Sequence, residues 1–371
     1  MSRPAEYDVA IIGGGLAGLS LAVRLAEPRF AYLRVLVLES RAAYTRDRTW
    51  CYWRTGPHPF ERAVTKSWTR WAVAGQGGHV ERSAAGIRYD CIPADSFYNL
   101  ALDQIAAAPN VELQLATRAD PTETQTGVTL GHAGTIARLA FDARPPPRLG
   151  LHGLAQRFLG QELEVERPIF DPGCAMLMDL APSQQGVHFT YVLPTSPTRA
   201  LVEDAWFARP GDAPPDHRAA LANWLDAQHA GHTRVLFEES GCLPMDPRFR
   251  PTQGGRLISL GGAAGAHRPA TGYAFTAVQE QCDFFCAHLE AALDSGRMPR
   301  LPRRIAAVRG MDRMILALLA RRPDMAPRMF VGLFAHCPAS RLVRFMADRP
   351  RAADLAAVVL ATARGLASSP A

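Results

Sequence analysis

The stretch Tyr7-Asp-Val-Ala-Ile-Ile-Gly-Gly-Gly-Leu-Ala-Gly-Leu-Ser-Leu-Ala-Val-Arg-Leu25 predicts a nucleotide-binding βαβ unit. Val9–Ile12 is a short, fully apolar run, as in a buried parallel strand, and a helix rich in Ala and Leu follows it. Between them, Gly13, Gly15 and Gly18 have G-x-G-x-x-G spacing. The first glycine makes the tight turn, the second lets a pyrophosphate approach the backbone, and the third lets the helix sit close to the strand. The helix N-terminus then offers free N–H groups and a positive dipole to the phosphates.

A second apolar run supplies the acid that completes this motif. Val35–Leu38 ends on Glu39, which lies 21 residues after Gly18. At this distance an acidic side chain accepts hydrogen bonds from the ribose hydroxyls. Strand, glycines, helix and acid therefore predict a Rossmann-type dinucleotide site at the N-terminus.

A second Gly-rich strand–loop–helix lies far downstream. The apolar run Leu257–Leu260 leads into Gly261, Gly262 and Gly265, and a helical pattern begins near 276. Such a loop can cover the ribityl and flavin end of a dinucleotide, so the pair of Gly-rich segments favours FAD over NAD.

The chain is long enough to bury a large core and to divide into two or three domains. It carries seven scattered cysteines with no C-x-x-C pair, the usage expected in a reducing cytosol. We predict no metal site. No secretory signal or membrane-spanning run of apolar residues is evident.

Positive charge is concentrated at the C-terminal end. From Arg300 onwards there are 13 Arg and four Asp residues, a net charge of +9, whereas the whole chain carries +6. A basic region on a near-neutral body can meet an anionic membrane surface, an acidic partner or nucleic acid.

The fold class that follows is α/β. We expect a Rossmann-type FAD-binding domain, like those of glutathione reductase and the flavin hydroxylases, built from residues 1–50, 90–147 and 255–298. Evenly spaced strand patterns between residues 154 and 207 predict an antiparallel substrate domain formed by residues 51–89 and 148–254. Residues 299–371 are expected to form a basic helical region. A helix capped by Asp95 and beginning at Ser96 is expected in the FAD domain.

Several blocks of sequence resemble the signatures of bacterial-type lycopene cyclases, the FAD-dependent lycopene beta-cyclase family. They occur in the order of that family and extend into the basic C-terminal region. The blocks are Asp47–Trp53 (DRTWCYW), Met178-Asp179, Tyr191–Pro194 (YVLP), Leu201–Asp204 (LVED), Glu239–Met245 (ESGCLPM) and Arg268–Phe275 (RPATGYAF).

The resemblance implies a peripheral membrane enzyme that closes the linear ends of lycopene into β-ionone rings without net redox change. It also implies FAD in its reduced form, with NAD(P)H as the electron source. The Gly-rich loops and Glu39 are the first expected cofactor-binding residues. We include Arg46, Thr271 and Gly272 among the expected cofactor-binding residues. Lycopene and related carotenoids are the expected substrates, and the inner face of the cell membrane, on its cytoplasmic side, is the expected location. Other carotenoid enzymes are conceivable partners, and nucleic acid is not expected.

Two departures from related patterns are informative. Flavin hydroxylases carry Asp where this chain has Gly262, which argues against hydroxylase chemistry. The family often has Thr and Tyr after the Glu-Asp pair, whereas this chain continues with Ala205-Trp206-Phe207.

Cyclisation needs a strong acid to protonate an alkene, a dry cavity for the carbocation, and a base to remove one ring proton. A carboxylic acid buried among apolar groups keeps its proton at neutral pH. The family block places this acid at Glu203, and Asp204 falls on the opposite face of the same strand. Glu239 is a second candidate acid or base.

Aromatic faces can stabilise the cation. The candidate substrate-binding residues are Trp50, Trp53, Tyr191, Trp206 and Tyr273. Two other functions remain open on the sequence. The first is another FAD enzyme of isoprenoids or aromatic substrates, such as a saturase or hydroxylase, which would consume NAD(P)H in proportion to product. The second is a catalytically silent carotenoid-binding flavoprotein.

Overall fold

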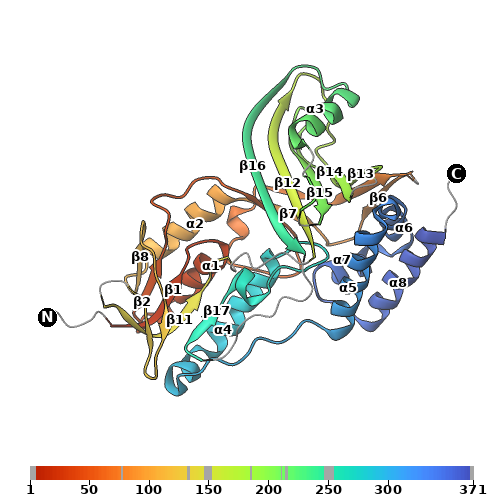
Figure 1. Cartoon of the computed structure of the whole chain (residues 1–371). Helices are drawn as coiled ribbons and strands as arrows, with labels where there is room; N and C mark the ends of the chain where they lie inside the picture. The colour runs from red at the N-terminus through yellow and green to blue at the C-terminus, as the bar shows by residue number, and fades with distance from the viewer. Residues whose placement is uncertain are drawn as a thin grey trace.

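Two large sheets and a group of C-terminal helices make up the molecule (Figure 1). The computed structural model describes residues 6–76, 78–131, 134–145, 153–183, 186–209, 211–213, 216–245 and 255–367. The first sheet lies near the N-terminus, the second projects away from it, and the C-terminal helices lie beside the second sheet.

The first sheet contains the N-terminal motif and is parallel at its centre. Parallel pairing joins β8, β2, β1, β11 and β17 in this order, while β10 pairs antiparallel with β11 and β9 pairs antiparallel with β10. Its strands are β1 (Glu6–Ile12), β2 (Val35–Leu38), β8 (Val111–Gln114), β9 (Thr122–Glu123), β10 (Val128–Thr129), β11 (Ile136–Asp142) and β17 (Leu257–Ser259). Val9–Ile12 is at most 2% exposed, which confirms the predicted buried strand.

Helices α1 (Leu16–Leu25), α2 (Ala94–Ala106) and α4 (Phe275–Ser295) pack with this sheet, and α1 contacts both of the others. Helix α2 begins two residues earlier than predicted. Pro93 occupies the N-cap position with φ of −64°, so the backbone is already set for a helix at Ala94. Asp95 lies in the first turn, where its charge still favours the helix dipole.

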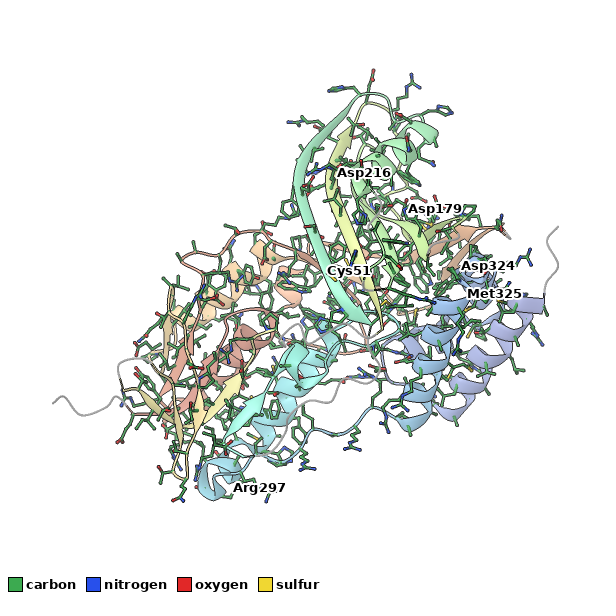
Figure 2. All side chains as sticks on the ribbon, viewed as in Figure 1. Cys51, Asp179, Asp216, Arg297, Asp324 and Met325 are labelled. Carbon is green, nitrogen blue, oxygen red and sulfur yellow. The ribbon has the colours of Figure 1, made fainter. Side chains whose placement is uncertain are left out.

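The second sheet has the order β16-β12-β15-β14-β13-β5-β6. Its strands are β5 (Arg70–Gly75), β6 (Gly78–Ser83), β12 (Leu154–Val165), β13 (Cys174–Ala181), β14 (Val187–Ser196), β15 (Arg199–Ala208) and β16 (Thr233–Met245). The pairs are antiparallel, as predicted, except that β5 runs parallel to β13. Strand β5 comes from an earlier segment of the chain, so no hairpin dictates its direction. Helix α3 (His217–Ala227), capped by Asp216, contacts β12 and β15 at the outer end of this sheet (Figure 2).

A small sheet links these layers. Strands β3 (Thr49–Trp53), β7 (Tyr89–Pro93) and β4 (Lys66–Trp68) are antiparallel in the order β3-β7-β4. Residues 51–89 are therefore divided between this small sheet and the edge of the second sheet. The domain boundaries predicted at 147–148 and at 254 lie outside the described residues.

The C-terminal region is helical and covers one face of the second sheet. It contains α5 (Ala306–Arg321), α6 (Ala326–His336), α7 (Ala339–Met346) and α8 (Ala352–Ala367). Helix α6 contacts β5, β6 and β13, and it crosses α8 where Gly332 meets Gly365. Within the described residues, no helix combines the length and apolar character needed to cross a membrane.

Short 3₁₀ turns complete the described structure. They are η1 (Pro28–Phe30), η2 (Glu61–Ala63), η3 (Gly261–Ala264) and η4 (Pro323–Met325).

Candidate active site

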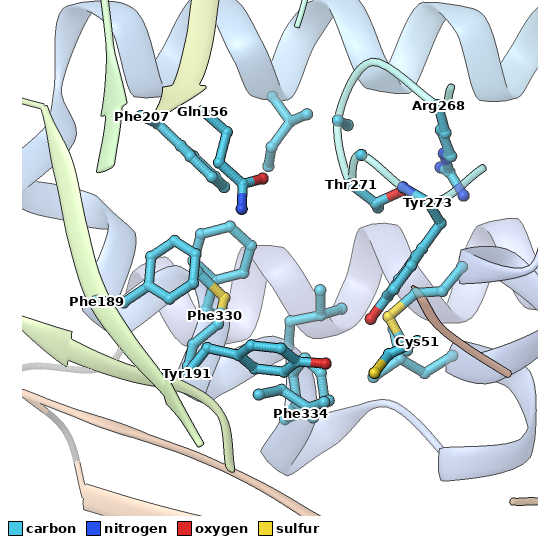
Figure 3. A pocket seen from close by; sticks show the side chains of 18 of the residues that line it. Cys51, Gln156, Phe189, Tyr191, Phe207, Arg268, Thr271, Tyr273, Phe330 and Phe334 are labelled. Atoms are coloured by element: carbon cyan, nitrogen blue, oxygen red, sulfur yellow. The ribbon is translucent and has the colours of Figure 1, made fainter. Parts of the chain in front are cut away.

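A cavity of about 470 Å³ lies between the second sheet and the C-terminal helices. Phe189, Tyr191 and Phe207 surround it from the sheet, and Phe330 and Phe334 from α6 (Figure 3). Helices α5, α7 and α8 and the loop with Thr271 and Gly272 also contribute to its wall. Most of the lining is therefore apolar or aromatic, as a site for a hydrocarbon requires.

The alternation of strand side chains explains how β14 and β15 build this wall. Phe189, Tyr191 and Leu193 face the cavity from β14, and Glu203 and Phe207 face it from β15. Residues two apart on a strand share one face.

Two carboxyl groups face the cavity from strands on either side of β12. Gly160 of β12 pairs with both Glu203 of β15 and Glu239 of β16, so the three residues form a row across the sheet. Their strands are two sheet spacings apart, or about 9.5 Å. A methyl group on Gly160 would lie 3.3 Å from Cγ of Glu239 and 3.6 Å from Cβ of Glu203. The glycine therefore leaves room between the two acids.

Burial raises the pKa of both carboxyl groups above that of an ordinary glutamate. Glu203 is 8% exposed and Glu239 is 6% exposed. Burial, with the charge of Glu239 in second place, raises the pKa of Glu203 well above its usual value. Burial also raises the pKa of Glu239 to about 7, although the Thr49 hydroxyl donates a hydrogen bond of 3.0 Å to its carboxylate. The pKa of Glu239 thus lies near neutrality, and that of Glu203 is shifted in the direction that favours its protonated form.

Asp204 is directed away from the cavity, so we correct its inclusion among the catalytic candidates. Its carboxylate contacts His188 and His217, with 2.6 Å to Nδ1 of His217. Burial opposes its ionisation, but the bonds from the two histidines lower the pKa of Asp204. Strand alternation separates it from Glu203.

Two of the five predicted substrate-binding aromatics line the cavity. Tyr191 and Tyr273 both reach the hydroxyl of Tyr89, at 2.8 and 3.2 Å. Figure 3 shows their hydroxyl ends near the thiol of Cys51. These three tyrosines form a hydrogen-bonded polar cluster in an otherwise apolar wall, and burial raises the pKa of each hydroxyl.

The three predicted tryptophans lie elsewhere. Trp50 packs edge-on against Phe97, with ring centroids 5.1 Å apart, and Trp53 packs against Trp71 at 4.6 Å. Trp206 shares the outward face of β15 with Asp204 and lies near Gly186. None of them lines the cavity, because each belongs to a packed region beside or behind it.

The N-terminal loop has the shape needed for a dinucleotide. Gly13 has a φ of +96°, and a side chain on Gly18 would overlap the Gly13 carbonyl at 1.9 Å. A side chain on Gly15 would meet nothing within 4 Å, so open space remains at the start of α1. The free N–H groups of this helix end face that space and can hold a pyrophosphate.

The ribose end of this site holds a buried acid and an unsatisfied hydroxyl. Glu39 is 4% exposed and accepts bonds from the N–H groups of Gly14 and Arg41, at 2.6 and 2.7 Å. Burial opposes ionisation, but these bonds and the Arg41 guanidinium lower the pKa of Glu39. The buried Tyr44 hydroxyl, beside Gly14, has no hydrogen-bond partner among the described residues. The residues present therefore fit the adenosine half of FAD.

The second Gly-rich loop packs directly on the first. Gly261 has a φ of +66°, and a side chain there would lie 2.5 Å from Cβ of Ala17 in α1. Gly262 is part of the same 3₁₀ turn, and Gly265 ends it in a left-handed conformation. Thr271 and Gly272, further along the same segment, line the cavity.

Arg46 lies away from both Gly-rich loops. Its guanidinium forms a 2.5 Å ion pair with Glu162 of β12 and lies 4.0 Å from the ring centroid of Phe237. This contact joins the segment after β2 to the second sheet. Its assignment as a cofactor-binding residue stays a prediction.

The sequence analysis missed much of the cavity wall. Phe189 and Phe207 could have been found, because they fall on the same strand faces as Tyr191 and Glu203. Phe330 and Phe334 have helical spacing, but that spacing indicates an apolar face without naming what it covers. Gln156 gave no signal, and Thr49 lay within the block Asp47–Trp53 without being named as a site residue.

Comparison with known proteins agrees with this geometry. The family described as lycopene cyclase protein matches residues 8–368. The chain belongs to the lycopene cyclase family. A lycopene beta-cyclase of a Paracoccus species is 28% identical over 402 residues, which cover 95% of this chain and 93% of the relative. A lycopene beta-cyclase of Pantoea ananas is 26% identical and covers 72% of this chain and 71% of its own.

Solved structures show the same fold at low identity. A geranylgeranyl bacteriochlorophyll reductase-like protein from Thermoplasma acidophilum has a TM-score of 0.62 at 14% identity, covering 97% of this chain and 96% of its own. Aklavinone-11 hydroxylase, solved with FAD and aklavinone, has a TM-score of 0.58 at 17% identity, covering 88% and 71%. This lycopene cyclase family member therefore has the fold of FAD-dependent enzymes, as predicted.

Proposed function

We propose that this protein is a lycopene β-cyclase that converts lycopene through γ-carotene to β-carotene. The observation that carries the proposal is Glu203, a carboxyl whose pKa is raised by burial and which faces an apolar cavity. The names of the two relatives described above support the substrate. The reaction is an acid-catalysed isomerisation in which no atoms are gained or lost.

Glu203 is the proposed acid. It donates its proton to the terminal trisubstituted alkene of the substrate, and the new cation attacks the neighbouring alkene to close the ring. An alkene is a very weak base, so the donor must be protonated at neutral pH, and burial shifts the pKa of Glu203 in the direction that favours this form.

The cavity wall protects and stabilises the cation. The rings of Phe189 and Phe207, with centroids 5.3 Å apart, and that of Phe330 present electron-rich faces. The apolar wall also excludes water, which would otherwise capture the cation as an alcohol.

Glu239 is the proposed base. With a pKa of about 7, its carboxylate form is substantially populated at neutral pH and can remove the ring proton. After each ring closure Glu239 holds a proton and Glu203 has lost one. Proton exchange with solvent then restores both groups.

Reduced FAD, held by Gly13, Gly15, Gly18 and Glu39 and by the loop from Gly261 to Gly265, would supply a fixed negative charge near the developing cation. The loop with Thr271 and Gly272 joins that site to the cavity wall. NAD(P)H is the proposed source of the electrons.

The cavity reaches the surface between α5 and α8, and this rim is apolar and exposed. Met314 of α5 is 62% exposed and Val359 of α8 is 47% exposed, and both line the cavity. Arg313 and Arg321 are exposed on the same helix as Met314. We propose that this rim lies on the inner face of the cell membrane, where lycopene enters and where other carotenoid enzymes can supply it.

The direct test is pigment analysis in bacteria that accumulate lycopene. The wild-type chain is expected to convert lycopene into γ- and β-carotene. Glu203→Gln is expected to lower conversion by about 10²–10⁴-fold, because it removes the transferable proton. Glu238→Gln is the matched control, since Glu238 is the exposed neighbour of Glu239 on β16. FAD content of each purified variant shows whether the fold is intact.

Persistent lycopene with the wild-type chain, or full conversion with Glu203→Gln, would contradict the proposal.

The ratio of NAD(P)H consumed to product formed distinguishes the other flavoenzyme functions from a cyclase. A saturase or hydroxylase consumes NAD(P)H with each product molecule, whereas a cyclase with reduced FAD consumes none once the flavin is reduced.

A further inference from the structure

A second cavity, of about 830 Å³, lies beside η3 and shares no lining residue with the first. One wall is the loop Ala264–Ala266 and the adjoining face of α4. The other wall is the segment 300–305, which runs back along α4 towards α5 after the chain turns near Arg297 (Figures 1 and 2). We call this second cavity the arginine groove.

Three guanidinium groups of the groove carry charge without a carboxylate partner among the described residues. They belong to Arg300, Arg303 and Arg309, and Nε of Arg309 is buried with no hydrogen-bond partner. A fourth, Arg304, is bound to Asp348 at 2.7 Å. A buried N–H without a partner is costly, so an acceptor in the groove would be bound favourably.

The two acids of the groove do not cancel this charge. Glu280 is paired with Arg349 at 2.6 Å, and Asp348 is paired with Arg304 through Oδ2, although its buried Oδ1 has no hydrogen-bond partner among the described residues. The groove therefore keeps three uncompensated positive groups, which suits a ligand with several phosphate oxygens.

Apolar and aromatic side chains on both walls of the groove are suited to a flat heterocycle. Phe284 of α4 lines the groove and is half-buried. Its ring packs in a tilted arrangement against the His288 ring, with the two ring centroids 4.3 Å apart. Leu301 and Ile305 add apolar surface from the opposite segment. Arginines that can bind phosphate, next to an aromatic ring that can stack on a base, are the pattern of a nucleotide site.

The groove also shares a structural element with the dinucleotide site. Gly261, at one end of η3, contacts α1, and Ala264, at the other end, lines the groove. The turn η3 therefore belongs both to the groove wall and to the Gly-rich loop that packs on α1.

We propose that the arginine groove binds the phosphates and base of a dihydronicotinamide dinucleotide, the reductant of the flavin. This inference rests on the proposed need for reduced FAD. In the reduction, a hydride leaves the dihydropyridine ring as its C–H bond breaks and forms an N–H bond on the flavin. The nicotinamide is oxidised to its pyridinium form by two electrons, and the flavin is reduced by the same two.

The test compares flavin reduction in holoenzymes by rapid mixing with NADPH and with NADH. The variant Arg300→Gln/Arg303→Gln/Arg309→Gln is compared with Arg297→Gln, which alters an exposed arginine just outside the groove. We expect at least a tenfold rise in the half-saturating NADPH concentration for the triple variant, a weaker salt dependence, and no change for Arg297→Gln. FAD content and Tm of each holoenzyme report on folding.

An unchanged half-saturating concentration in the triple variant would overturn the inference. If the half-saturating NADPH concentration of the triple variant is unchanged and its binding to vesicles of anionic phospholipid is lost, the inference is also overturned. The groove would then be a lipid headgroup site. Cyclisation by wild-type enzyme reduced chemically with dithionite tests the proposed function separately. If dithionite-reduced enzyme does not cyclise lycopene, the proposed function fails, while the flavin-reduction assay still reports on the groove.

Discussion

At the scale of single residues, the two cavity acids differ in task because they differ in surroundings. Glu203 is surrounded by apolar groups, whereas Glu239 receives a hydrogen bond from Thr49. The pKa of Glu203 is raised well above that of an ordinary glutamate, and that of Glu239 is raised to about 7. Two carboxyls with separated acidities can act as acid and base in one reaction.

The raised pKa of Glu239 makes a prediction for stability. The pKa of Glu239 is about 7 in the folded state and 4.5 in an ordinary glutamate. The contribution of Glu239 to the free energy of unfolding is therefore fully present below pH 4.5 and is lost as the pH rises through 7. The loss amounts to about 3 kcal/mol at most. Glu239→Gln should therefore reduce the fall in stability between pH 5 and 8.5. Urea unfolding across this pH range measures it, with Glu238→Gln as the control, and parallel curves for wild type and Glu239→Gln would contradict the raised pKa.

The same titration predicts the pH dependence of catalysis. If Glu239 must be ionised to remove the ring proton, the rate of cyclisation should fall about tenfold for each pH unit below 7. Lowering the pH favours the protonated form of Glu203, whose pKa burial raises, so this group should add no loss of rate. Initial rates with dithionite-reduced enzyme at pH 5 to 8 provide the measurement. A rate that rises as the pH is lowered would exclude Glu239 as the base.

At the scale of elements, the crossing of α6 and α8 determines the shape of the cavity wall. A methyl group on Gly332 would lie 2.1 Å from Cα of Gly365, which is backbone and cannot move aside. Gly332→Ala should force the helices apart, destabilise the protein by about 1–3 kcal/mol and lower cyclisation.

Gly310→Ala is the control for this crossing, since a side chain there meets nothing within 4 Å and α5 gains a better helix former. Thermal unfolding of both variants tests the prediction. It fails if Gly332→Ala is as stable as Gly310→Ala.

The elements were predictable where local pattern determines them. The buried run Val9–Ile12 and its glycines specified the first sheet, and strand alternation separated Glu203 from Asp204. The same alternation would have excluded Trp206, which shares a face with Asp204. The contribution of α5 to α8 to the cavity could not be predicted, because an amphipathic pattern shows that a helix is packed but not against what. Trp50 likewise packs, partly buried, against Phe97, a partner distant in sequence.

At the scale of the whole molecule, the cavity opens at a rim of exposed apolar side chains on helices rich in arginine. Met314 and Val359 form part of this rim, and residues from Arg300 onwards carry a net charge of +9. Apolar insertion and attraction to anionic lipid both favour docking of this side on a membrane.

Met314→Asp/Val359→Asp should weaken binding to vesicles containing anionic phospholipid by at least tenfold, because two charges replace inserted apolar groups. Leu115→Asp, at the first sheet and 38% exposed, is the control. Vesicle co-sedimentation at low and high salt measures the effect, and salt should weaken the wild-type interaction. Equal co-sedimentation of the rim variant and Leu115→Asp would contradict docking through this rim.

The central claim is that an acid in exchange with solvent protonates the substrate and that the product gains no hydrogen overall. Mass spectrometry of β-carotene formed in D₂O by dithionite-reduced enzyme tests this most directly. Glu203 exchanges its proton with solvent, and the proton lost at ring closure comes from the substrate. We therefore predict one deuterium in each ring in D₂O, and a product of the same mass as lycopene in H₂O. Rings free of deuterium, or a product heavier than lycopene in H₂O, would contradict the account.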